Sequence, residues 1–440
     1  MYTSTIGKIF LDAYNEKYQT EYSAKEFFTE VFIPLFYDHH KYMMTGGNSP
    51  LENPKLSWDD MIKGKKQYET QEQRKERIDK IINKIETSKA DMSIAIGFGV
   101  LDTTNASASQ ITDLDINSNK EVVYLSWVGA GLGITIAGGY TILFSDKQLL
   151  LDIFEGWHFY RMYLEEYPML KGNQINSWNG LWLEHRYNDQ YDEDMPTAGM
   201  NPINTLNEGL LNIGICQWLD VLWGIALHYK SLSMLGYIYK IGQTNSTIGF
   251  IPFRLDEIKR PYIFWRKIFG EEIPTENISK MKKLYGTKEG LISSMLKGSI
   301  GIQTMKPKDL VTYMPGPKSK SVKYKTDEDK VTFNIYLIWI IAMLNNEKMW
   351  DLSQDFAKVL LAYEKGAQKA SRVRANNVSQ LLESSTPRLF IENLIPIVKD
   401  AESEIVEKLS QIGKIVNDIP RDNYPYFSTL IKFQYALSNK

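Results

Sequence analysis

The uncharged stretch from Val122 to Phe144 constrains the fold of this chain more than any other feature. About 20 apolar residues span a bilayer as a helix, so its length alone would allow a membrane protein. Five glycines interrupt the stretch, and each costs a helix about 1 kcal/mol relative to alanine. Apolar residues alternate on both sides of Gly138-Gly139, which is typical of a β-hairpin. We therefore expect a buried glycine-rich hairpin inside a globular domain, and no interaction with a membrane.

The composition is that of an ordinary folded protein in a reducing compartment. The chain has 440 residues, of which 43% are apolar and 24% charged, enough for two or three domains. Cys216 is the only cysteine, which excludes a disulfide framework and a thiolate zinc site. The first residues lack the basic start and apolar core of a signal peptide. These features predict a cytoplasmic protein.

We expect an α+β fold in three parts. Residues 1–304 mix helices with antiparallel glycine-rich hairpins, one within Val122–Phe144 and a second formed by residues 235–241 and 247–253. Residues 305–330 are rich in proline and lysine and are predicted to be a linker or mobile loop. Residues 331–440 show only helical patterns, which predicts an all-α C-terminal helical bundle.

Local signals set the expected element boundaries. Residues 23–26 and 145–148 match the capping box, in which a Ser and a Glu or Gln three residues later satisfy free backbone N–H groups. Pro34 and Pro396 are expected to break helices, because proline lacks the amide hydrogen. A charged helix, a strand, a polar loop and an apolar helix are predicted at 68–90, 92–100, 103–119 and 207–229, respectively.

The triplet Asp38-His39-His40 is the first candidate for catalysis. Such triplets occur in metal-dependent phosphoesterases, which also need an upstream Asp-x-Asp, whereas only Asp12 precedes this one. A polar helix end, with histidines near the negative end of the helix dipole, explains the triplet better. Glu257-Ile-Lys259 and Gly129–Gly133 resemble a nuclease triplet and a phosphate loop only superficially. We therefore expect no enzyme, metal site or cofactor.

Basic residues point more clearly to nucleic acid. A helix predicted over 353–376 places Lys358, Lys365, Lys369 and Arg372 at i, i+7, i+11 and i+14, on the face opposite its apolar residues. A cationic stripe of this kind suits a phosphate backbone, where each neutralised phosphate releases counterions. A merely solvated face explains the pattern equally well.

The linker adds four more candidate cations, which are Lys318, Lys320, Lys323 and Lys325. A mobile polycationic loop beside a basic helix could clamp a nucleic-acid strand. The net charge of the whole chain is −2, so any such binding must come from local patches of this kind.

Two polar loops have side chains suited to reading base edges. They contain Gly46, Gly47, Asn48 and Ser49 in one case, and Gln243 and Asn245 in the other. Asn and Gln offer paired donor and acceptor groups to adenine, and glycine allows close approach to a groove. Turn formation alone explains both loops equally well.

The last part of the chain resembles a known family. Residues 419–436 read IPRDNYPYFSTLIKFQYA, which is similar to the ending of several large subunits of type I CRISPR surveillance complexes (Cascade). A mixed N-terminal region, a basic linker and a C-terminal bundle match that layout. The resemblance implies a non-catalytic subunit that reads a protospacer-adjacent motif in double-stranded target DNA. It further implies contact with CRISPR RNA, with other Cascade subunits and with a helicase–nuclease effector.

The leading hypothesis is therefore a DNA-recognition subunit of an RNA-guided antiviral defence complex. Backbone contact is assigned to the basic helix and the linker, and groove reading to the loop at Asn48. One alternative is a metal-dependent nuclease that uses Asp38, His39 and His40. A second is a structural scaffold protein without nucleic acid, in which the basic face is only solvated.

Overall fold

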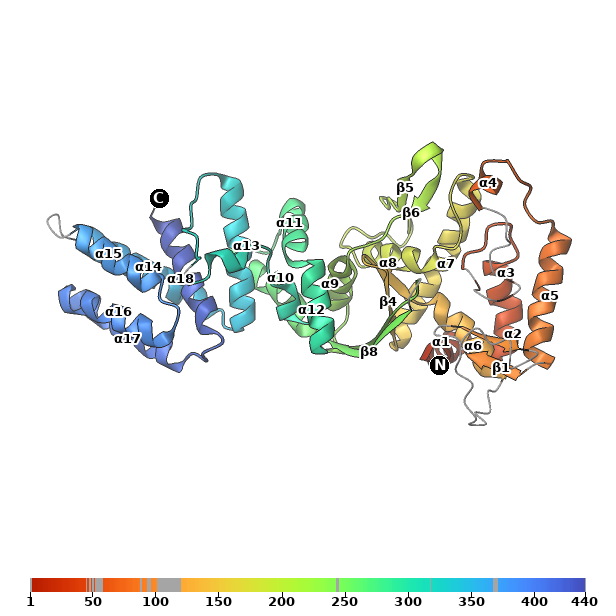
Figure 1. Ribbon diagram of the computed structural model, residues 1–440, viewed down its shortest axis with the longest axis horizontal. Coiled ribbons are helices and arrows are strands. Elements are labelled where there is room, and N and C mark those ends of the chain that lie inside the picture. Colours follow the sequence, from red (N-terminus) through yellow and green to blue (C-terminus); the bar gives the residue numbers. More distant parts are fainter. Residues whose placement is uncertain are drawn as a thin grey trace. The chain divides into compact units, whose positions relative to one another are not determined.

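The computed structural model describes residues 2–44, 46, 49, 51, 58–87, 89–92, 96–100, 120–242, 245–316, 318–366 and 371–439 (Figure 1). The chain divides into two compact units, Met1–Leu255 with Lys297–Ser299, and Asp256–Leu296 with Ile300–Lys440. The expected boundary at residues 304/305 stays a prediction. The fold is a mostly helical α+β fold, with a small antiparallel sheet in the first half and a helical C-terminal region, α13–α18.

Helices make up most of the first unit. They are α1 (Tyr2–Tyr18), α2 (Ala24–Phe27), a π-helical turn η1 (Phe28–Phe32), α3 (Ile33–Phe36), α4 (Trp58–Ile62), α5 (Gln71–Thr87), α6 (Lys120–Gly131), α7 (Lys147–Glu166), α8 (Ile175–Arg186), a 3-10 turn η3 (Asn207–Gly209) and α9 (Trp218–His228). Large aromatic side chains fill the interior between these helices, including Trp127, Trp157, Trp178 and Trp182.

A four-stranded antiparallel sheet lies among these helices in the order β3-β4-β7-β8. Its strands are β3 (Ile134–Ile136), β4 (Tyr140–Phe144), β7 (Met234–Lys240) and β8 (Ser246–Phe253). Ile134 pairs with Ile142, and Tyr237 pairs with both Leu143 and Phe250. Gly138 and Gly139 turn the first hairpin with φ angles of 102° and 77°, which glycine adopts without a steric penalty. Both predicted hairpins are confirmed.

The first half of the opening stretch is a helix, which was not predicted, and the hairpin occupies only the second half. Residues up to Gly131 form α6, which packs directly against α1. A Cβ atom on Gly129 would lie 1.8 Å from the carbonyl oxygen of Thr3, and one on Gly7 would lie 2.0 Å from that of Leu125. These glycines therefore let two helix backbones approach closely, and the packing outweighs their poor helix propensity.

Two boundaries around the first helices differ in detail from the sequence expectation. The Ser23–Glu26 capping box is present, but the helix does not break at Pro34. Instead, the Ile33 N–H bonds the Phe28 carbonyl across the π-helical turn immediately before the proline. Asp146, and not Ser145, caps α7 by accepting a hydrogen bond from the Leu149 N–H at 2.9 Å.

Two further predictions for the first unit are wrong. Residues 92–100 contain parts of two strands, since β1 (Lys89–Met92) pairs antiparallel with β2 (Gly97–Val100). Residues 207–229 are not one helix, because a turn with positive φ at Glu208 and Gly209 leads into β6 (Leu211–Ile213), the partner of β5 (Ile203–Thr205). The predicted loop at 103–119 lies outside the described residues.

The second unit is helical. It contains α10 (Leu255–Phe269), α11 (Thr275–Tyr285), α12 (Lys288–Lys297), the 3-10 turns η4 (Ile302–Met305) and η5 (Leu310–Tyr313), α13 (Asp327–Leu344), α14 (Lys348–Lys365), α15 (Ser371–Leu382), α16 (Pro387–Asp400), α17 (Ser403–Asp418) and α18 (Tyr424–Ser438). Helices α14–α18 share one apolar core, which includes Phe356, Leu360, Tyr363, Leu381, Phe390 and Phe427.

Two expectations about the C-terminal helices are wrong. The single helix predicted over 353–376 is interrupted, because α14 ends at Lys365 and α15 begins at Ser371. The basic residues therefore do not lie along one continuous helix face. Pro396 stays inside α16, where its side chain is exposed; the carbonyl that its missing N–H leaves unpaired can bond water instead. Among the described residues, no helix is long and apolar enough to cross a membrane.

Candidate functional site

The lysine-rich segment 318–325 is anchored on the C-terminal helices. Lys318, Lys320, Lys323 and Lys325 are exposed, whereas Val322 and Tyr324 between them are partly buried. The Lys320 N–H donates to the Thr312 carbonyl at 2.7 Å. The alternation therefore turns the four ammonium groups to solvent while the intervening side chains pack inward.

A buried lysine on α18 holds this segment in place. The Nζ atom of Lys432 donates to Ser319 Oγ and to Glu383 Oε1, both at 2.6 Å. The Lys432 side chain is only 6% exposed and the Glu383 side chain 42%. Burial of an ammonium group is tolerated when a carboxylate and further acceptors surround it. Lys432 therefore joins α18, α15 and the lysine-rich segment.

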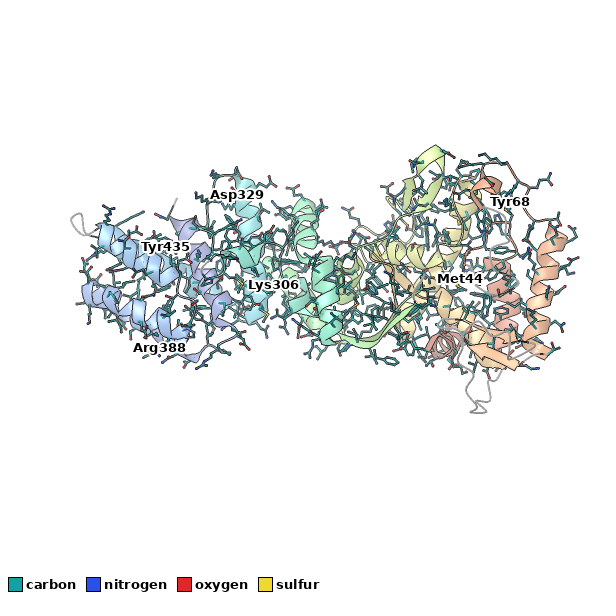
Figure 2. All side chains as sticks on the ribbon, in the orientation of Figure 1. Met44, Tyr68, Lys306, Asp329, Arg388 and Tyr435 are labelled. Carbon is teal, nitrogen blue, oxygen red and sulfur yellow. The ribbon has the colours of Figure 1, made fainter. Side chains whose placement is uncertain are left out.

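A cavity of about 360 Å³ lies beneath the segment. Its walls come from the segment, from α15 and the residue that follows it, and from α18 and its end. The lining residues are Ser321, Val322, Tyr324, Ala375, Val378, Ser379, Leu382, Glu383, Lys432, Tyr435, Ala436 and Asn439. Figure 2 labels Tyr435, which contributes to the α18 wall. We call this cavity the bundle pocket.

Two of the predicted helix cations are close in sequence to residues at this pocket. The Tyr435 hydroxyl contacts the carboxylate of Glu364, and Lys365 is the next residue of α14. Arg372 precedes the lining residue Ala375 by three positions on α15, and residues three apart share a helix face. We define the cationic rim as Lys318, Lys320, Lys323, Lys325, Lys365 and Arg372.

The rim cations differ from the other predicted basic residues in their pairing. Within the described part of the chain, no carboxylate lies within ion-pair distance of any of the six. Lys358, in contrast, lies 3.7 Å from Asp355 and 3.5 Å from the Gln354 side-chain oxygen. Lys369 lies outside the described residues. Six of the eight predicted cations thus lie on segments that line the pocket or contact a residue lining it.

The predicted groove-reading loops show structural roles where they are described. Gly46 is buried, and a Cβ atom there would lie 2.4 Å from the Trp127 ring. Ser49 closes a turn, with its N–H on the Gly46 carbonyl at 3.0 Å. Asn245 accepts a hydrogen bond from the Gly242 N–H at 3.1 Å. Gly47, Asn48 and Gln243 lie outside the described residues, so their role stays a prediction.

The Asp38-His39-His40 triplet follows α3, in electropositive surroundings. The two imidazole rings stack at 4.0 Å, and His39 Nδ1 accepts the Lys41 N–H at 2.9 Å. Burial, together with the nearby charges of Arg161 and Lys41, lowers the pKa of His39 to about 3 and that of His40 to about 4. The cations that keep these rings neutral would also repel a metal ion.

The same cations complete the ends of two helices. The Lys41 side chain, on a residue that is 2% exposed, donates to the Leu164 and Tyr167 carbonyls at 3.0 and 2.8 Å. Arg161 donates to the carbonyls of Leu35, Phe36 and Lys41 at 2.7–3.3 Å. Burial lowers the pKa of Lys41 to about 8 and that of Arg161 to about 10. Helix ends leave carbonyls without partners, and these two side chains supply them.

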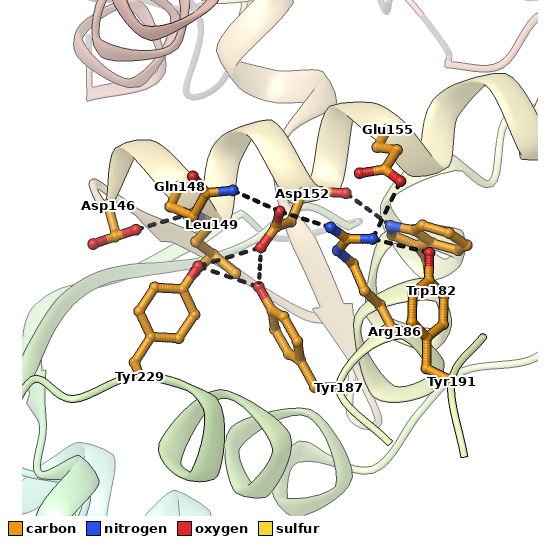
Figure 3. Close-up of polar contacts among 10 residues, drawn as sticks. All are labelled: Asp146, Gln148, Leu149, Asp152, Glu155, Trp182, Arg186, Tyr187, Tyr191 and Tyr229. Atoms are coloured by element: carbon orange, nitrogen blue, oxygen red, sulfur yellow. Dashed lines mark hydrogen bonds and ion pairs between the residues drawn. The ribbon is translucent and has the colours of Figure 1, made fainter. Parts of the chain in front are cut away.

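A second buried polar cluster surrounds Asp152, which is 1% exposed (Figure 3). Its carboxylate accepts hydrogen bonds from the Tyr187 hydroxyl at 2.7 Å and the Gln148 amide at 2.9 Å, and lies 3.3 Å from Arg186. Burial raises the pKa of Tyr187, with the Asp152 charge as a further cause. This cluster was not predicted from the sequence, although an Asp among the apolar residues of a helix indicates a buried carboxylate. Its groups satisfy one another, which is typical of a structural network.

Comparisons with known proteins do not assign the chain to a family. No family model, no curated protein and no solved structure matches the chain. Within the residues that the structure describes, no group of three or more His, Cys, Asp or Glu side chains could hold a metal ion.

Proposed function

We propose that this chain binds nucleic acid through the cationic rim of its C-terminal unit. The supporting observation is that six exposed cations, without carboxylate partners in the described chain, lie on segments that line one pocket or contact a residue lining it. Like charges held close together repel one another, and an anionic ligand removes that cost. Phosphate groups in a row are the ligand chemistry that matches a series of separate, exposed lysines.

The finer proposal is a non-catalytic DNA-recognition subunit of an RNA-guided antiviral complex. It rests on the resemblance of residues 419–436 to Cascade large subunits. In this proposal the rim contacts the backbone of target DNA or CRISPR RNA, and Asn48 and Gln243 read base edges. The remaining Cascade subunits and the helicase–nuclease effector are its protein partners.

Charge reversal of the rim tests the binding proposal. The variant Lys320→Glu/Lys323→Glu/Lys325→Glu removes three phosphate contacts from the full-length chain. The slope of log K against log salt concentration should fall in magnitude by about 2 to 3, because each contact contributes roughly 0.7 to 0.9. Fluorescence anisotropy with labelled single-stranded and duplex oligonucleotides, at several salt concentrations, measures both affinity and slope.

A matched control has the same change of charge elsewhere in the unit. Lys399→Glu/Lys408→Glu/Lys414→Glu changes three exposed lysines on α16 and α17, none of which lines the pocket. Its affinity should fall less, and its salt slope should stay close to that of the unmodified chain. Equal losses in the two variants would show a non-specific charge effect and contradict the proposed role of the rim. Absence of binding by the unmodified chain would favour a scaffold protein.

A further inference from the structure

We infer that the bundle pocket receives one unpaired nucleotide of a single strand, while the cationic rim holds the adjoining phosphates. This inference rests on the proposed function and specifies its substrate class. It assigns different parts of the ligand to the pocket and to the rim. The size, the walls and the distribution of charge of the pocket each support it.

The size of the pocket suits a single nucleotide. Ligand sites in proteins commonly have volumes of about 300–1,000 Å³, and this one has about 360 Å³. A base inside a duplex is stacked and paired, and it must leave the helix to enter a pocket of this kind. A single strand presents its bases without that cost. The pocket therefore favours unpaired over paired nucleic acid.

The walls carry groups suited to a base. Tyr324 from the lysine-rich segment and Tyr435 from α18 both line the cavity, and aromatic rings are the usual stacking partners of unpaired bases. Ser379, Glu383 and Asn439 supply hydrogen-bond donors and acceptors to the same cavity. Aromatic faces together with a few polar groups are what a planar, hydrogen-bonding ligand requires.

The distribution of charge separates a nucleotide from other anions. The cation that lines the cavity, Lys432, is paired with Glu383 at 2.6 Å. The unpaired cations lie instead on the rim. A free phosphate or a phosphorylated side chain would need an unpaired cation within the pocket. A nucleotide places its uncharged base inside and its phosphates outside, which agrees with the observed distribution.

Filling the pocket without changing its charge tests the inference. Ser379 is an exposed residue of α15 that lines the pocket, and Gln380 is its exposed neighbour outside the lining. The full-length Ser379→Trp variant should bind a 12-residue oligo-dT or oligo-U about 10-fold more weakly, with an unchanged salt slope and unchanged duplex binding. Gln380→Trp should bind all three probes like the unmodified chain.

A fluorescent base gives a direct readout. 2-Aminopurine within the single strand should be quenched by the unmodified chain through stacking, and not by Ser379→Trp. Comparison of the dT and U probes identifies whether the strand is DNA or RNA. Equal single-strand affinity and quenching in both tryptophan variants would overturn the inference while leaving the rim proposal intact. Salt-independent or absent binding of every probe would overturn the proposed function itself.

Discussion

Two groups of cations, one in each unit, have opposite roles. In the first unit, Lys41 and Arg161 lie inside the protein and donate to backbone carbonyls at the ends of helices. In the second unit, the cationic rim is exposed and has no carboxylate partner in the described chain. The first arrangement completes the hydrogen bonding of the fold. The second leaves positive charge free for a ligand.

This difference explains why basic residues alone are a poor guide to function. Arg161 and Lys41 carry the same kinds of basic group as the rim residues, but their hydrogen-bonding capacity is used within the fold. Paired surface ions such as Lys358 with Asp355 lie between these two cases. They have a partner, but exposed pairs contribute at most about 1 kcal/mol to stability. The absence of a partner, together with a position beside the bundle pocket, separates the candidate ligand site from a structural cation.

Loss of Arg161 should have the largest effect on stability. Arg161→Met removes the donors to the carbonyls of Leu35, Phe36 and Lys41. The Phe36 carbonyl keeps the Met43 N–H at 3.0 Å, so we expect a loss of about 4 kcal/mol in the free energy of unfolding, because each of the other two carbonyls left without this donor costs roughly 1–3 kcal/mol. Urea unfolding followed by tryptophan fluorescence measures it.

Arg388→Ala is the matched control, because the Arg388 side chain on α16 is 88% exposed and pairs with Glu392 on the same helix. Its unfolding free energy should change by less than about 0.5 kcal/mol. If the two arginine substitutions changed the free energy of unfolding equally, the proposed difference between structural and exposed cations would be wrong.

Loss of the Asp152 carboxylate should have a smaller effect. Asp152→Ala removes the acceptor of Tyr187 and Gln148, but Arg186 keeps Glu155 at 3.2 Å and the Tyr191 hydroxyl at 2.9 Å. We expect a loss of about 2 kcal/mol, measured by the same unfolding experiment. Glu155→Gln, which alters the more exposed partner of Arg186, should cost less than about 1 kcal/mol. A neutral effect of Asp152→Ala would show that the buried network adds nothing to stability.

The histidine pair should give a small, pH-dependent effect. The pKa values of about 3 and 4 for His39 and His40 in the folded chain lie below the usual value of 6.5. Between these pKa values and 6.5, the unfolded chain therefore binds more protons than the folded chain does. The stability that the neutral rings retain above pH 6.5 is therefore lost progressively as the pH falls towards 4 and 3. We expect a loss on the order of 1 kcal/mol between pH 6.5 and 5.5.

Urea midpoints measured across this pH range test the histidine prediction. The double variant His39→Asn/His40→Asn should show a flatter dependence on pH than the unmodified chain. The same slope in both proteins would mean that these two rings are not held neutral by their surroundings.

The features that the sequence predicted correctly have local causes. The Ser23–Glu26 capping box and the Gly138-Gly139 turn each depend on residues within a few positions. The failures have distant causes. Gly129 has a low helix propensity, but α6 packs so closely against Thr3 of α1 that this position of the helix needs a glycine. Pro396 disfavours a helix interior, yet its exposed position makes it tolerable.

The candidate site was predictable only in part. The lysines of the linker and the helix were identifiable from composition and spacing, because basic residues cluster along the sequence there. The pocket was not, because it joins Val322, Val378 and Tyr435, which are distant in sequence. The break after Lys365 was also hidden, since Lys365 and Arg372 share one face in the helical pattern. The link between the end of α14 and the pocket comes from the tertiary contact of Tyr435 with Glu364.

Lysine labelling with and without an oligonucleotide tests the comparison most directly. An amine-reactive reagent and mass spectrometry report the reactivity of each lysine in the full-length chain. We expect Lys41 to stay unlabelled with and without the oligonucleotide, because it is 2% exposed. Lys320, Lys323, Lys325 and Lys365 should be labelled in the free chain and protected by a bound single strand, while Lys399, Lys408 and Lys414 stay labelled throughout. If the rim lysines remained equally reactive with the oligonucleotide bound, the cationic rim would not be the nucleic-acid-binding surface.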